Sequence, residues 1–530
     1  MFRRFVIAYS FVMLFLVISA VGTASAALGN ATYTEAVGRQ STYSLHVASS
    51  RGTIYDRNLQ PLTNASQKYI AAVVPTVDTI ARLHSITDVD QRDEIRAAME
   101  NGKPFLMEVN SPVNTEGIYV FSVDERYSTM QPASNLIGYL ENGKSGASGL
   151  EKYMDNLLAE TGEIEIEFTV NALGQAITGI NGMVTNTYSS AHSGVVVTLD
   201  ADVQRNLELA CAEIRKGAAV VLECRTGKIL AMASFPALDP NHLASSMNHP
   251  DAPFVNRALC AYAPGSVFKL ISAAAALENG WDYRETYICT GTISVDGMNF
   301  ACYEHTAHGE VNLHTAIRQS CNGYFIHLLQ NMGADPVLEL LHAWDAEEPV
   351  GLYDAFASQA GHLPSSDNLK NPRACANFAF GQGDVAMTPL HVAGIINTIA
   401  MNGEYLEPQI YGGVVDMNME ISGSPALESR KIIEQPTAER LRAYMESTAR
   451  FGTARIGAPR NCLSGIKTGT AQTGVPDENG EEICNYWYAG YICDKEDMPL
   501  YTIVIVEESG AKTKVPQAFQ KIAEMLADFI

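Results

Sequence analysis

A serine at the start of an apolar helix, three residues ahead of a lysine, is the first place where this sequence could carry out chemistry. Pro264 and Gly265 precede Ser266, and an Ala-rich run of good helix formers follows. Ser266 therefore lies in the predicted first turn, where unpaired backbone N–H groups favour a developing negative charge. Lys269 shares a helix face with Ser266 and could take its proton. The pair predicts a nucleophilic serine with an amine base, although an N-cap serine beside a solvated lysine would give the same sequence pattern.

A second motif, "KTGTAQTG", lies near the C-terminus. Lys467 starts a predicted strand, in which Gly469 would let a substrate backbone approach closely. Thr468 and Thr470 can donate hydrogen bonds to a carboxylate. Ser464 also stands three residues before a lysine, but it leads into this strand rather than into a helix. Motifs of the forms Ser-x-x-Lys and Lys-Thr-Gly occur together with Ser-Asp-Asn in serine-acylating penicillin-binding proteins and class A β-lactamases, so a third motif is expected.

The third motif has three candidate strings. Residues 246–248 read Ser-Met-Asn but come too early in the chain, and residues 366–368 spell Ser-Asp-Asn inside a polar, Pro-bounded loop. Ser320, Cys321 and Asn322 lie in a short break between two helical runs, where side chains can point into a cleft. We therefore predict Ser320 and Asn322 as the site residues of this motif.

Together the motifs make the chain resemble a class B penicillin-binding protein, a monofunctional D,D-transpeptidase of peptidoglycan synthesis. Two of them resemble parts of that family's N-terminal pedestal domain and four resemble its transpeptidase domain, all in the family's order: "SRGTIYDRN", "GASGLEKYMD", "APGSVFK", "AIRQSCNGYF", "FGQGDVAMTPLHVA" and "KTGTAQT". The resemblance extends over nearly the whole chain. It implies a mixed α/β pedestal domain over residues 51–190 and a transpeptidase domain, similar in fold to the serine β-lactamases, over residues 191–530.

The resemblance also implies a role for each catalytic residue. Ser266 would attack the carbonyl of the penultimate D-alanine of a stem peptide while Lys269 takes the hydroxyl proton. Ser320 and Lys467 would relay a proton to the departing D-alanine, and Asn322 would hold the donor peptide. An amine of a second peptide would then resolve the acyl-enzyme, and β-lactams would trap it. Burial and the neighbouring Lys467 should lower the pKa of Lys269 enough for it to act as a base.

Substrate binding and partners follow from the same resemblance. Thr468, Gly469 and Thr470 would bind the terminal carboxylate, and the backbone N–H groups of Ser266 and Thr470 would form an oxyanion hole. The expected ligands are stem peptides ending in D-Ala-D-Ala and β-lactams, and the expected protein partner is a membrane glycosyltransferase of the division or elongation machinery. The compact pedestal slightly favours division. No cofactor and no metal are implied.

Apolar periodicity predicts the elements that must position these residues. A β-rich run begins at Gly194, and "GAAVVLECRTGKILAMASF" predicts two strands joined by a turn. Apolar helices follow, including the one that begins at Ser266. "NYWYAGYI" and "LYTIVIVEE" predict two more strands, and helical spacing runs from Gln517 to Ile530. Strands at both ends with helices between them predict an α+β fold, an antiparallel sheet with helices on its faces.

The N-terminal residues predict a membrane anchor. Phe5–Ala27 carries no charged side chain and is long enough to cross a bilayer as one helix. Two arginines precede it, which predicts a single-pass protein with a cytoplasmic N-terminus and an extracytoplasmic catalytic domain. A cleaved signal peptide, cut after residues 24–26, is the alternative, but the apolar run is longer than usual for one. Residues 1–28 are expected to form the cytoplasmic stub and anchor, and residues 29–50 a linker.

The cysteines leave several interpretations open. The chain has 10 cysteines, and an exported protein often pairs them. Cys289 and Cys302 flank a Gly-containing segment whose hairpin could bring them together in a disulfide. With His305 and His308 they also resemble a set of metal ligands, but the spacing is irregular for a structural zinc site. A disulfide or plain packing is therefore expected in preference to zinc.

Composition narrows the class of protein, and four other functions remain open. The net charge of -23 argues against nucleic acid as a partner, and 47% hydrophobic residues argue against a disordered chain. A class A-like β-lactamase would be much shorter and would lack the pedestal. A membrane β-lactam sensor would carry several spans, and a bifunctional glycosyltransferase would need a longer N-terminal domain. An inactive scaffold would keep the motifs without becoming acylated by penicillin.

Overall fold

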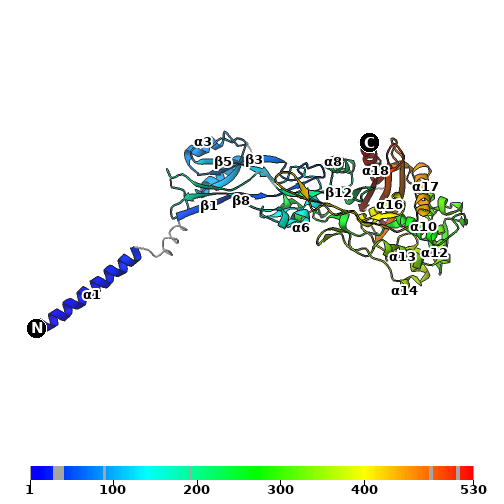
Figure 1. The fold of residues 1–530 in the computed structure, drawn as a ribbon, viewed down its shortest axis with the longest axis horizontal. Coiled ribbons are helices and arrows are strands. Elements are labelled where there is room, and N and C mark those ends of the chain that lie inside the picture. Colours follow the sequence, from blue (N-terminus) through cyan, green and yellow to red (C-terminus); the bar gives the residue numbers. More distant parts are fainter. Residues whose placement is uncertain are drawn as a thin grey trace. The chain divides into compact units, whose positions relative to one another are not determined.

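The computed structural model describes residues 2–27, 41–87, 91–177, 179–189, 193–476, 482–508 and 514–528. Within these ranges the chain forms two compact units, whose elements are labelled in Figure 1. The first unit draws on residues 1–50, 66–125 and 160–190, and the second on residues 51–65, 126–159 and 191–530. The division into a pedestal over residues 51–190 and a transpeptidase domain over residues 191–530 stays a prediction. Residues 29–40 of the expected linker lie outside the described residues.

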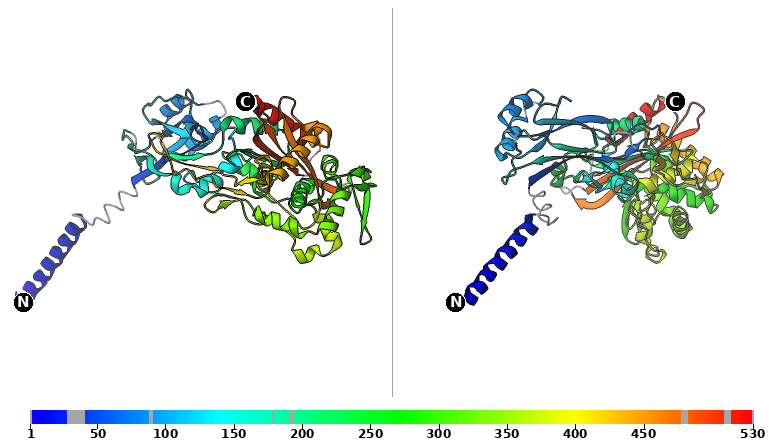
Figure 2. Two further views of the ribbon diagram at one scale, coloured as in Figure 1. Left: turned by 45° about the vertical axis from the view of Figure 1, so that its right-hand side comes forward. Right: turned by 60° about the vertical axis from the view of Figure 1, so that its left-hand side comes forward.

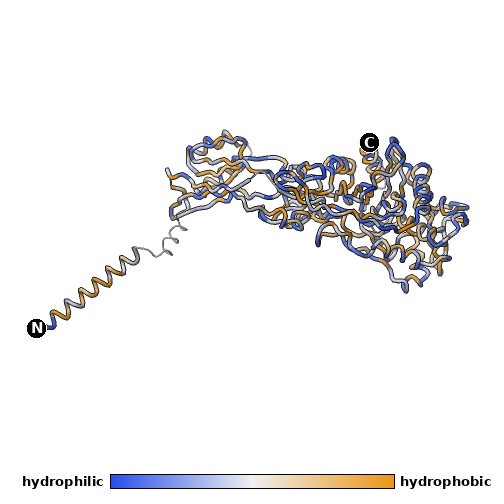
Figure 3. Tube along the Cα trace, viewed as in Figure 1, coloured by the Kyte–Doolittle hydropathy of each residue, from blue (hydrophilic) through white to orange (hydrophobic). Residues whose placement is uncertain are grey.

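The N-terminal helix α1 (Phe2–Ala27) is 26 residues long and apolar along almost its whole length (Figure 3). Its residues Phe2–Ser25 have the length and composition that a membrane span needs, and none of this stretch is buried. Exposed apolar surface costs about 25 cal/mol per Å² in water, so a bilayer is the environment that suits this helix. The helix fits the predicted membrane anchor.

The first unit contains two small sheets. Strands β3 (Ser66–Val73), β4 (Phe105–Val109) and β5 (Ile118–Glu125) form an antiparallel sheet in the order β4-β3-β5. Residues of α3 (Val77–Leu83) and α4 (Arg92–Asn101) share a core with this sheet. The second sheet has the order β1-β8-β9 and consists of Thr42–Arg51, Ala159–Thr169 and Met183–Asn186.

A five-stranded antiparallel sheet is the centre of the second unit. It has the order β12-β11-β25-β24-β23. The strands are β11 (Gly217–Glu223), β12 (Ile229–Phe235), β23 (Ser464–Pro476), β24 (Glu482–Cys493) and β25 (Pro499–Glu508). β11 and β12 come early in the unit's sequence, and β23, β24 and β25 come near its end. The pairing of β11 with β25 joins these two groups of strands into one sheet. The predicted antiparallel sheet is confirmed.

Helices cover both faces of this sheet (Figures 1 and 2). Successive side chains of β11 alternate between the faces: Ala218 and Val220 belong to one hydrophobic core, and Ala219 and Val221 to the other. The second core includes residues of α8 and α18, and the first includes residues of α10, α16 and α17. These helices span Ala201–Ala210, Lys514–Ala527, Lys269–Glu278, Pro389–Ala400 and Gln435–Phe451.

The remaining elements of the second unit surround this three-layer core. Its longer helices are α11 (Leu313–Gln319), α12 (Asn322–Met332) and α13 (Asp335–Ala343). Its shorter helices are α5 (Ser134–Ile137), α6 (Gly149–Tyr153), α7 (Asp155–Leu158), α9 (Leu243–Met247), α14 (Ser366–Leu369) and α15 (Pro372–Phe378). A four-stranded sheet of order β2-β10-β20-β21 consists of Thr53–Tyr55, Gly194–Val197, Tyr411–Val415 and Ile421–Ser422. Paired short strands are β6 (Leu140–Glu141) with β7 (Ser145–Gly146), β13 (Tyr287–Cys289) with β16 (Gly309–Val311), β14 (Thr292–Val295) with β15 (Met298–Ala301), β17 (Gly351–Tyr353) with β18 (Phe356–Ala357), and β19 (Glu404–Leu406) with β22 (Ser429–Lys431).

The two motifs that the sequence analysis assigned to the pedestal meet inside the second unit. Arg51 of the first motif donates from Nε to Oε2 of Glu151 of the second over 2.8 Å, and from Nη2 to Oδ1 of Asp155 over 2.8 Å. Arg126 binds the other oxygen of Glu151 at 2.7 Å. Burial raises the pKa of Glu151, but the two guanidinium groups outweigh burial and hold that pKa below its usual value. A buried carboxylate shared by two arginines therefore joins the two motifs.

Candidate active site

Ser266 lies in a tight 3₁₀ turn, η3 (Gly265–Phe268), which leads directly into α10. Gly265 has φ +54°, and a Cβ on it would come within 2.8 Å of the backbone oxygen of Thr470 in β23. The N–H of Gly265 donates to the backbone oxygen of Gly381 over 2.9 Å. A glycine is therefore required here, because the turn that carries Ser266 packs directly against the strand of the Lys-Thr-Gly motif.

The amine of Lys269 is fully buried and surrounded by oxygen atoms. Its Nζ lies 2.9 Å from Oγ of Ser266, 2.7 Å from the backbone oxygen of Ser320, 3.2 Å from Oγ of Ser320 and 2.6 Å from Oδ1 of Asn322. An ammonium group has three N–H donors and no lone pair, whereas a neutral amine can accept one proton from a hydroxyl. Burial lowers the pKa of Lys269 to about 8. The geometry therefore lets the neutral amine accept the proton of Ser266.

Lys467 reaches the same hydroxyl from the other side. Its Nζ, fully buried in β23, lies 3.0 Å from Oγ of Ser320 and 2.7 Å from the backbone oxygen of Thr468. Burial lowers the pKa of Lys467 well below its usual value, and the nearby charge of Lys269 lowers it further. Burial, one of the two predicted causes, is the main reason for the lowered pKa of both lysines, and the neighbouring charge adds to it at Lys467. Oγ of Ser320 thus connects the two amines.

The break between α11 and α12 holds Ser320 and Asn322 in place. Ser320 ends α11 in the left-handed region at φ 55°, and Cys321 caps the N-terminus of α12. Nδ2 of Asn322 donates to the backbone oxygen of Ala301 over 2.7 Å, which turns Oδ1 toward Lys269. The predicted short break between two helices is confirmed, and a left-handed residue forms it.

Strand β23 supplies a threonine-bearing edge to the site. It is the last strand in the order of the five-stranded sheet, so only β24 pairs with it among the described strands. A Cβ on Gly469 would lie 3.0 Å from the backbone oxygen of Pro264, so a larger side chain would crowd the turn before Ser266. An edge strand beside a nucleophile can take an extended peptide as an additional strand. The hydroxyl groups of Thr468 and Thr453 lie 2.9 Å apart beside it.

The structure brings five predicted residues into direct contact: Ser266, Lys269, Ser320, Asn322 and Lys467. Thr468 contacts Lys467 through its backbone oxygen, and Gly469 and Thr470 follow it in β23 next to the turn of Ser266.

Two further neighbours of the site were missed at the sequence level. Thr453 had no local signal, because it becomes a neighbour of Thr468 only through packing between α17 and β23. Gln382, which donates to the backbone oxygen of Thr470 over 3.4 Å, lies within the quoted string "FGQGDVAMTPLHVA" but had no assigned role.

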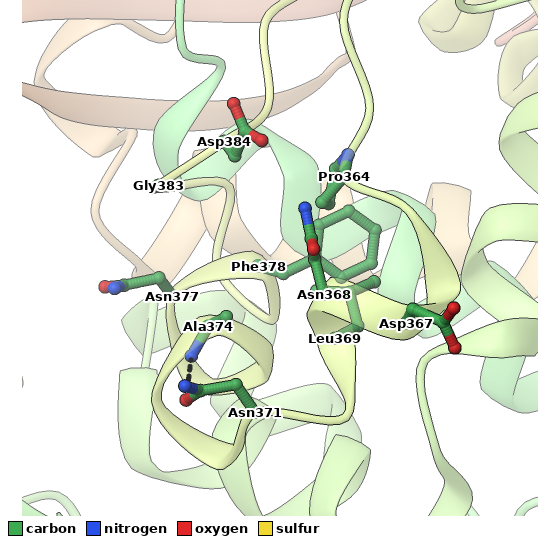
Figure 4. A pocket seen from close by; sticks show the side chains of 10 residues that line it. All are labelled: Pro364, Asp367, Asn368, Leu369, Asn371, Ala374, Asn377, Phe378, Gly383 and Asp384. Carbon is green, nitrogen blue, oxygen red and sulfur yellow. Dashed lines mark hydrogen bonds between the residues drawn. The ribbon is translucent and has the colours of Figure 1, made fainter.

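The literal Ser-Asp-Asn string lies elsewhere. It forms α14, where Oγ of Ser366 donates to Asp335 over 2.6 Å. Asp367 and Asn368 line an open pocket of about 480 Å³ together with Asp384 (Figure 4). No hydrogen bond among the described residues joins this string to Ser266 or to either lysine, so its rejection in favour of Ser320 and Asn322 agrees with the geometry.

Comparison with known protein families gives a match over more than half of the chain. A family model described as "Penicillin binding protein transpeptidase domain" matches residues 217–524. The peptidoglycan D,D-transpeptidase PbpA of Mycobacterium tuberculosis is 29% identical over 330 residues, which are 58% of this chain and 64% of that protein. The chain thus spans a little under two thirds of the length of this relative.

Solved structures with the same fold include two of particular interest. Penicillin-binding protein A of Mycobacterium tuberculosis, solved as a ceftriaxone acyl-enzyme complex, is 25% identical with a TM-score of 0.57 over 63% of this chain and 80% of that one. A chain of a peptidoglycan synthase complex, described as coordinating polymerization and crosslinking, is 23% identical with a TM-score of 0.69 over 98% of each chain. These likenesses confirm the predicted fold class.

Proposed function

Because the chain belongs to the penicillin-binding protein transpeptidase family, among its class B members, we propose that it is a serine D,D-transpeptidase that cross-links peptidoglycan stem peptides. The observation that carries the proposal is the 2.9 Å contact between Nζ of Lys269 and Oγ of Ser266, made by a fully buried amine whose pKa is lowered to about 8. A nucleophile beside a base of this kind is suited to acyl transfer.

Acylation of Ser266 is the first step of the proposed reaction. Lys269 takes the hydroxyl proton as Oγ of Ser266 attacks the carbonyl carbon of the penultimate D-alanine. The carbonyl oxygen gains negative charge, which the backbone N–H groups of Ser266 and Thr470 would stabilise. One such donor is worth about 2.7–4 kcal/mol of barrier in other enzymes. The C–N bond then breaks, and the terminal D-alanine leaves as an amine.

The departing amine needs a proton, and the contacts of Ser320 suit a relay. Its Oγ lies 3.2 Å from Nζ of Lys269 and 3.0 Å from Nζ of Lys467. The proton taken from Ser266 can therefore pass through the hydroxyl of Ser320 to the leaving nitrogen. In the second step the amine of another stem peptide gives up a proton by the same route, attacks the ester and restores Ser266.

Substrate recognition is assigned to β23 and to α12. Thr468 and Thr470 present two hydroxyl groups along the strand, which suits a terminal carboxylate beside an extended peptide, and Gly469 between them lets the strand pack closely against the turn before Ser266. Asn322 would hold the donor peptide through its amide. β-Lactams resemble the D-Ala-D-Ala end in chemistry, and the ceftriaxone acyl-enzyme of the Mycobacterium tuberculosis protein supports their binding at Ser266.

The cellular setting is part of the proposal. Two arginines at the start of α1 favour a cytoplasmic N-terminus, so the units that follow would lie outside the cell membrane. A membrane glycosyltransferase would supply the glycan strands, and the likeness to a chain of a peptidoglycan synthase complex supports this partner. A role in division rather than elongation stays a proposal from the sequence.

The test uses the purified full-length chain with a pentapeptide donor that ends in D-Ala-D-Ala and an amine acceptor. The proposal predicts release of D-alanine in equal amount with a cross-linked product, and loss of both in Ser266→Ala. Fast hydrolysis of penicillin without a cross-linked product would identify a β-lactamase instead. Penicillin labelling without D-alanine release would identify a sensor, and no labelling at all would identify an inactive scaffold.

A further inference from the structure

Three thiols and one imidazole converge next to the active site. The ligand-type atoms of Cys289, Cys302, Cys321 and His308 all lie within 4.8 Å of one another. The three cysteines are buried and His308 is half-buried. The set grouped from the sequence contained His305 in place of Cys321. In the structure His305 is exposed and stands outside the group, while Cys321 arrives from the Ser-x-Asn motif.

The distances between these atoms fit a tetrahedral metal. Sγ of Cys289 lies 3.6 Å from Sγ of Cys302 and 3.4 Å from Nδ1 of His308, and Sγ of Cys302 lies 3.9 Å from Sγ of Cys321. Four ligands around a zinc ion, with Zn–S near 2.3 Å and Zn–N near 2.0–2.1 Å, place two sulfurs about 3.8 Å apart and a sulfur and a nitrogen about 3.6 Å apart. These three spacings agree with the two values within a few tenths of an ångström, and the other three pairs of ligand atoms lie within 4.8 Å.

The ligand atoms are brought together by regular elements rather than by a chance meeting of loops. β13 pairs with β16 so that Cys289 faces Gly309, and this pairing places the neighbouring His308 beside Cys289. Cys302 directly follows the β14–β15 hairpin, and its N–H donates to the backbone oxygen of Gly291 over 2.9 Å. Cys321 caps α12, and its sulfur accepts from the N–H of Tyr324 at 3.5 Å. A helix N-terminus favours the thiolate form that a metal requires.

We propose that Cys289, Cys302, Cys321 and His308 bind one Zn²⁺ ion in a closed, structural site. Three thiolates and a neutral imidazole form one of the common structural zinc sets, and a tetrahedral site of four protein ligands leaves no open position for catalysis. This site replaces the sequence-based expectation that no metal is bound. The residues between the first two cysteines form the β14–β15 hairpin, which explains the irregular spacing.

The proposed ion would hold the Ser-x-Asn motif in position. Cys321 lies between Ser320, whose hydroxyl contacts both lysines, and Asn322, which contacts Lys269. Cys302 follows Ala301, whose backbone oxygen receives the hydrogen bond of Asn322. One ion bound to both cysteines would therefore fix the hairpin and the start of α12 as a single rigid support for the lysine cluster.

A disulfide between two of these cysteines is the alternative to the proposed zinc site. A disulfide needs an S–S distance of about 2.05 Å, and the closest pair in the group, Cys289 and Cys302, lies at 3.6 Å. It would also use only two of the three thiols and would leave the imidazole without a role. The site thus suits an ion better than a bridge.

The test measures metal and thiols in the full-length chain, purified in detergent without added metal or chelator. Elemental analysis by mass spectrometry should find about one zinc per chain. Denaturation with a chelator should then release the zinc and leave all 10 cysteines able to react with a thiol reagent. A chain without zinc would overturn the proposal, as would one that is two hydrogens lighter because Cys289 and Cys302 form a disulfide.

Matched variants assign the ligands. His308→Ala and Cys302→Ser should lose most of the bound zinc, whereas His305→Ala and Cys375→Ser, which alter a neighbouring histidine and a cysteine outside the group, should keep it. If Cys302→Ser does not fold, His308→Ala still tests the assignment, because His308 is only half-buried and its replacement should disturb the fold less.

Cobalt substitution provides a second readout, because thiolate ligands give charge-transfer absorption that weakens in Cys302→Ser. Zinc retained in both His308→Ala and Cys302→Ser would overturn the assignment. None of these readouts depends on transpeptidase activity, so failure of the proposed function would leave them unchanged.

Discussion

At the scale of single residues, the site is defined by two buried amines that share one hydroxyl. Nζ of Lys269 and Nζ of Lys467 both contact Oγ of Ser320, and neither lysine side chain is exposed. Two ammonium groups in one buried site are unfavourable, so burial favours the neutral form of each amine and lowers the pKa of both. Burial thus supplies the base without a carboxylate or a histidine.

The rate of acylation should rise with pH. Burial lowers the pKa of Lys269 to about 8, and only the neutral amine can take the proton of Ser266. Below that pKa the rate constant should increase about tenfold per pH unit, and above it the rate should level off. Stopped-flow measurement of acylation by a fluorescent penicillin would record this profile, corrected for the pH stability of the reagent. A rate that stays constant or falls as pH rises would contradict the role given to Lys269.

Removal of the shared hydroxyl should slow the reaction without unfolding the chain. In Ser320→Ala the proton has no relay between Lys269 and Lys467, and loss of a proton-transfer group costs about a hundredfold or more in rate. Acylation kinetics together with the melting temperature would separate a slower reaction from a loss of fold. Ser366→Ala, in the literal Ser-Asp-Asn string of α14, is the matched control and should react at the wild-type rate.

At the scale of the elements, packing brings together residues that lie far apart in the sequence. The spacing of Ser266 and Lys269 on one helix face was predictable because helical geometry is local, and so was the break that contains Ser320 and Asn322. The pairing of β11 with β25 and the contact of Thr453 with Thr468 were not predictable, because register and strand order depend on tertiary packing. The sequence therefore predicts which elements occur, and the long-range pairing sets which of them meet.

The turn before Ser266 should not tolerate a side chain. Gly265→Ala would have to keep φ near +54° and would place its Cβ about 2.8 Å from the backbone oxygen of Thr470. The turn and β23 should separate, so penicillin acylation should be lost and the melting temperature should fall. Gly280→Ala is the control for a left-handed glycine, because nothing lies within 4 Å of the Cβ that it would gain. Wild-type acylation by Gly265→Ala would show that the close approach is not needed.

The ion cluster that joins the two pedestal motifs should be important for stability. Glu151 is fully buried between Arg51 and Arg126, and its removal leaves two guanidinium groups without their shared partner. Loss of one member of a buried ion pair typically costs about 3–5 kcal/mol. Glu151→Ala should therefore unfold at clearly lower urea concentration, whereas Asp155→Ala, at a more exposed carboxylate, should lose less. Equal losses in the two variants would contradict this account.

At the scale of the whole molecule, the chain combines a candidate membrane span with a transpeptidase unit. The apolar helix α1 was predictable because a run of uncharged residues of this length needs no tertiary information. The convergence of Cys321 with Cys289, Cys302 and His308 was not predictable, since the four residues meet only after β13, β16 and α12 have packed. The set grouped from the sequence therefore contained His305 instead of Cys321.

The proposed orientation predicts which part of the chain an added protease can digest, and it predicts that a chain without α1 is released from the membrane. In intact cells whose outer layers have been permeabilised, an added protease should digest the chain and leave only a short fragment that contains α1. Removal of residues 2–27 should release a chain that no longer sediments with membranes and still binds penicillin, because the site residues all lie in the second unit. Full protection of the intact chain from the protease would reverse the proposed topology.

The central claim is that the hydroxyl of Ser266 is the acylated nucleophile of a slow-turnover site. Mass spectrometry of the intact chain after incubation with benzylpenicillin tests it most directly, followed by digestion to locate the modified residue. We expect an increase equal to one penicillin molecule, carried by Ser266, stable over many minutes and absent in Ser266→Ala. An adduct on another residue, an adduct that persists in Ser266→Ala, or no adduct at all would contradict the account.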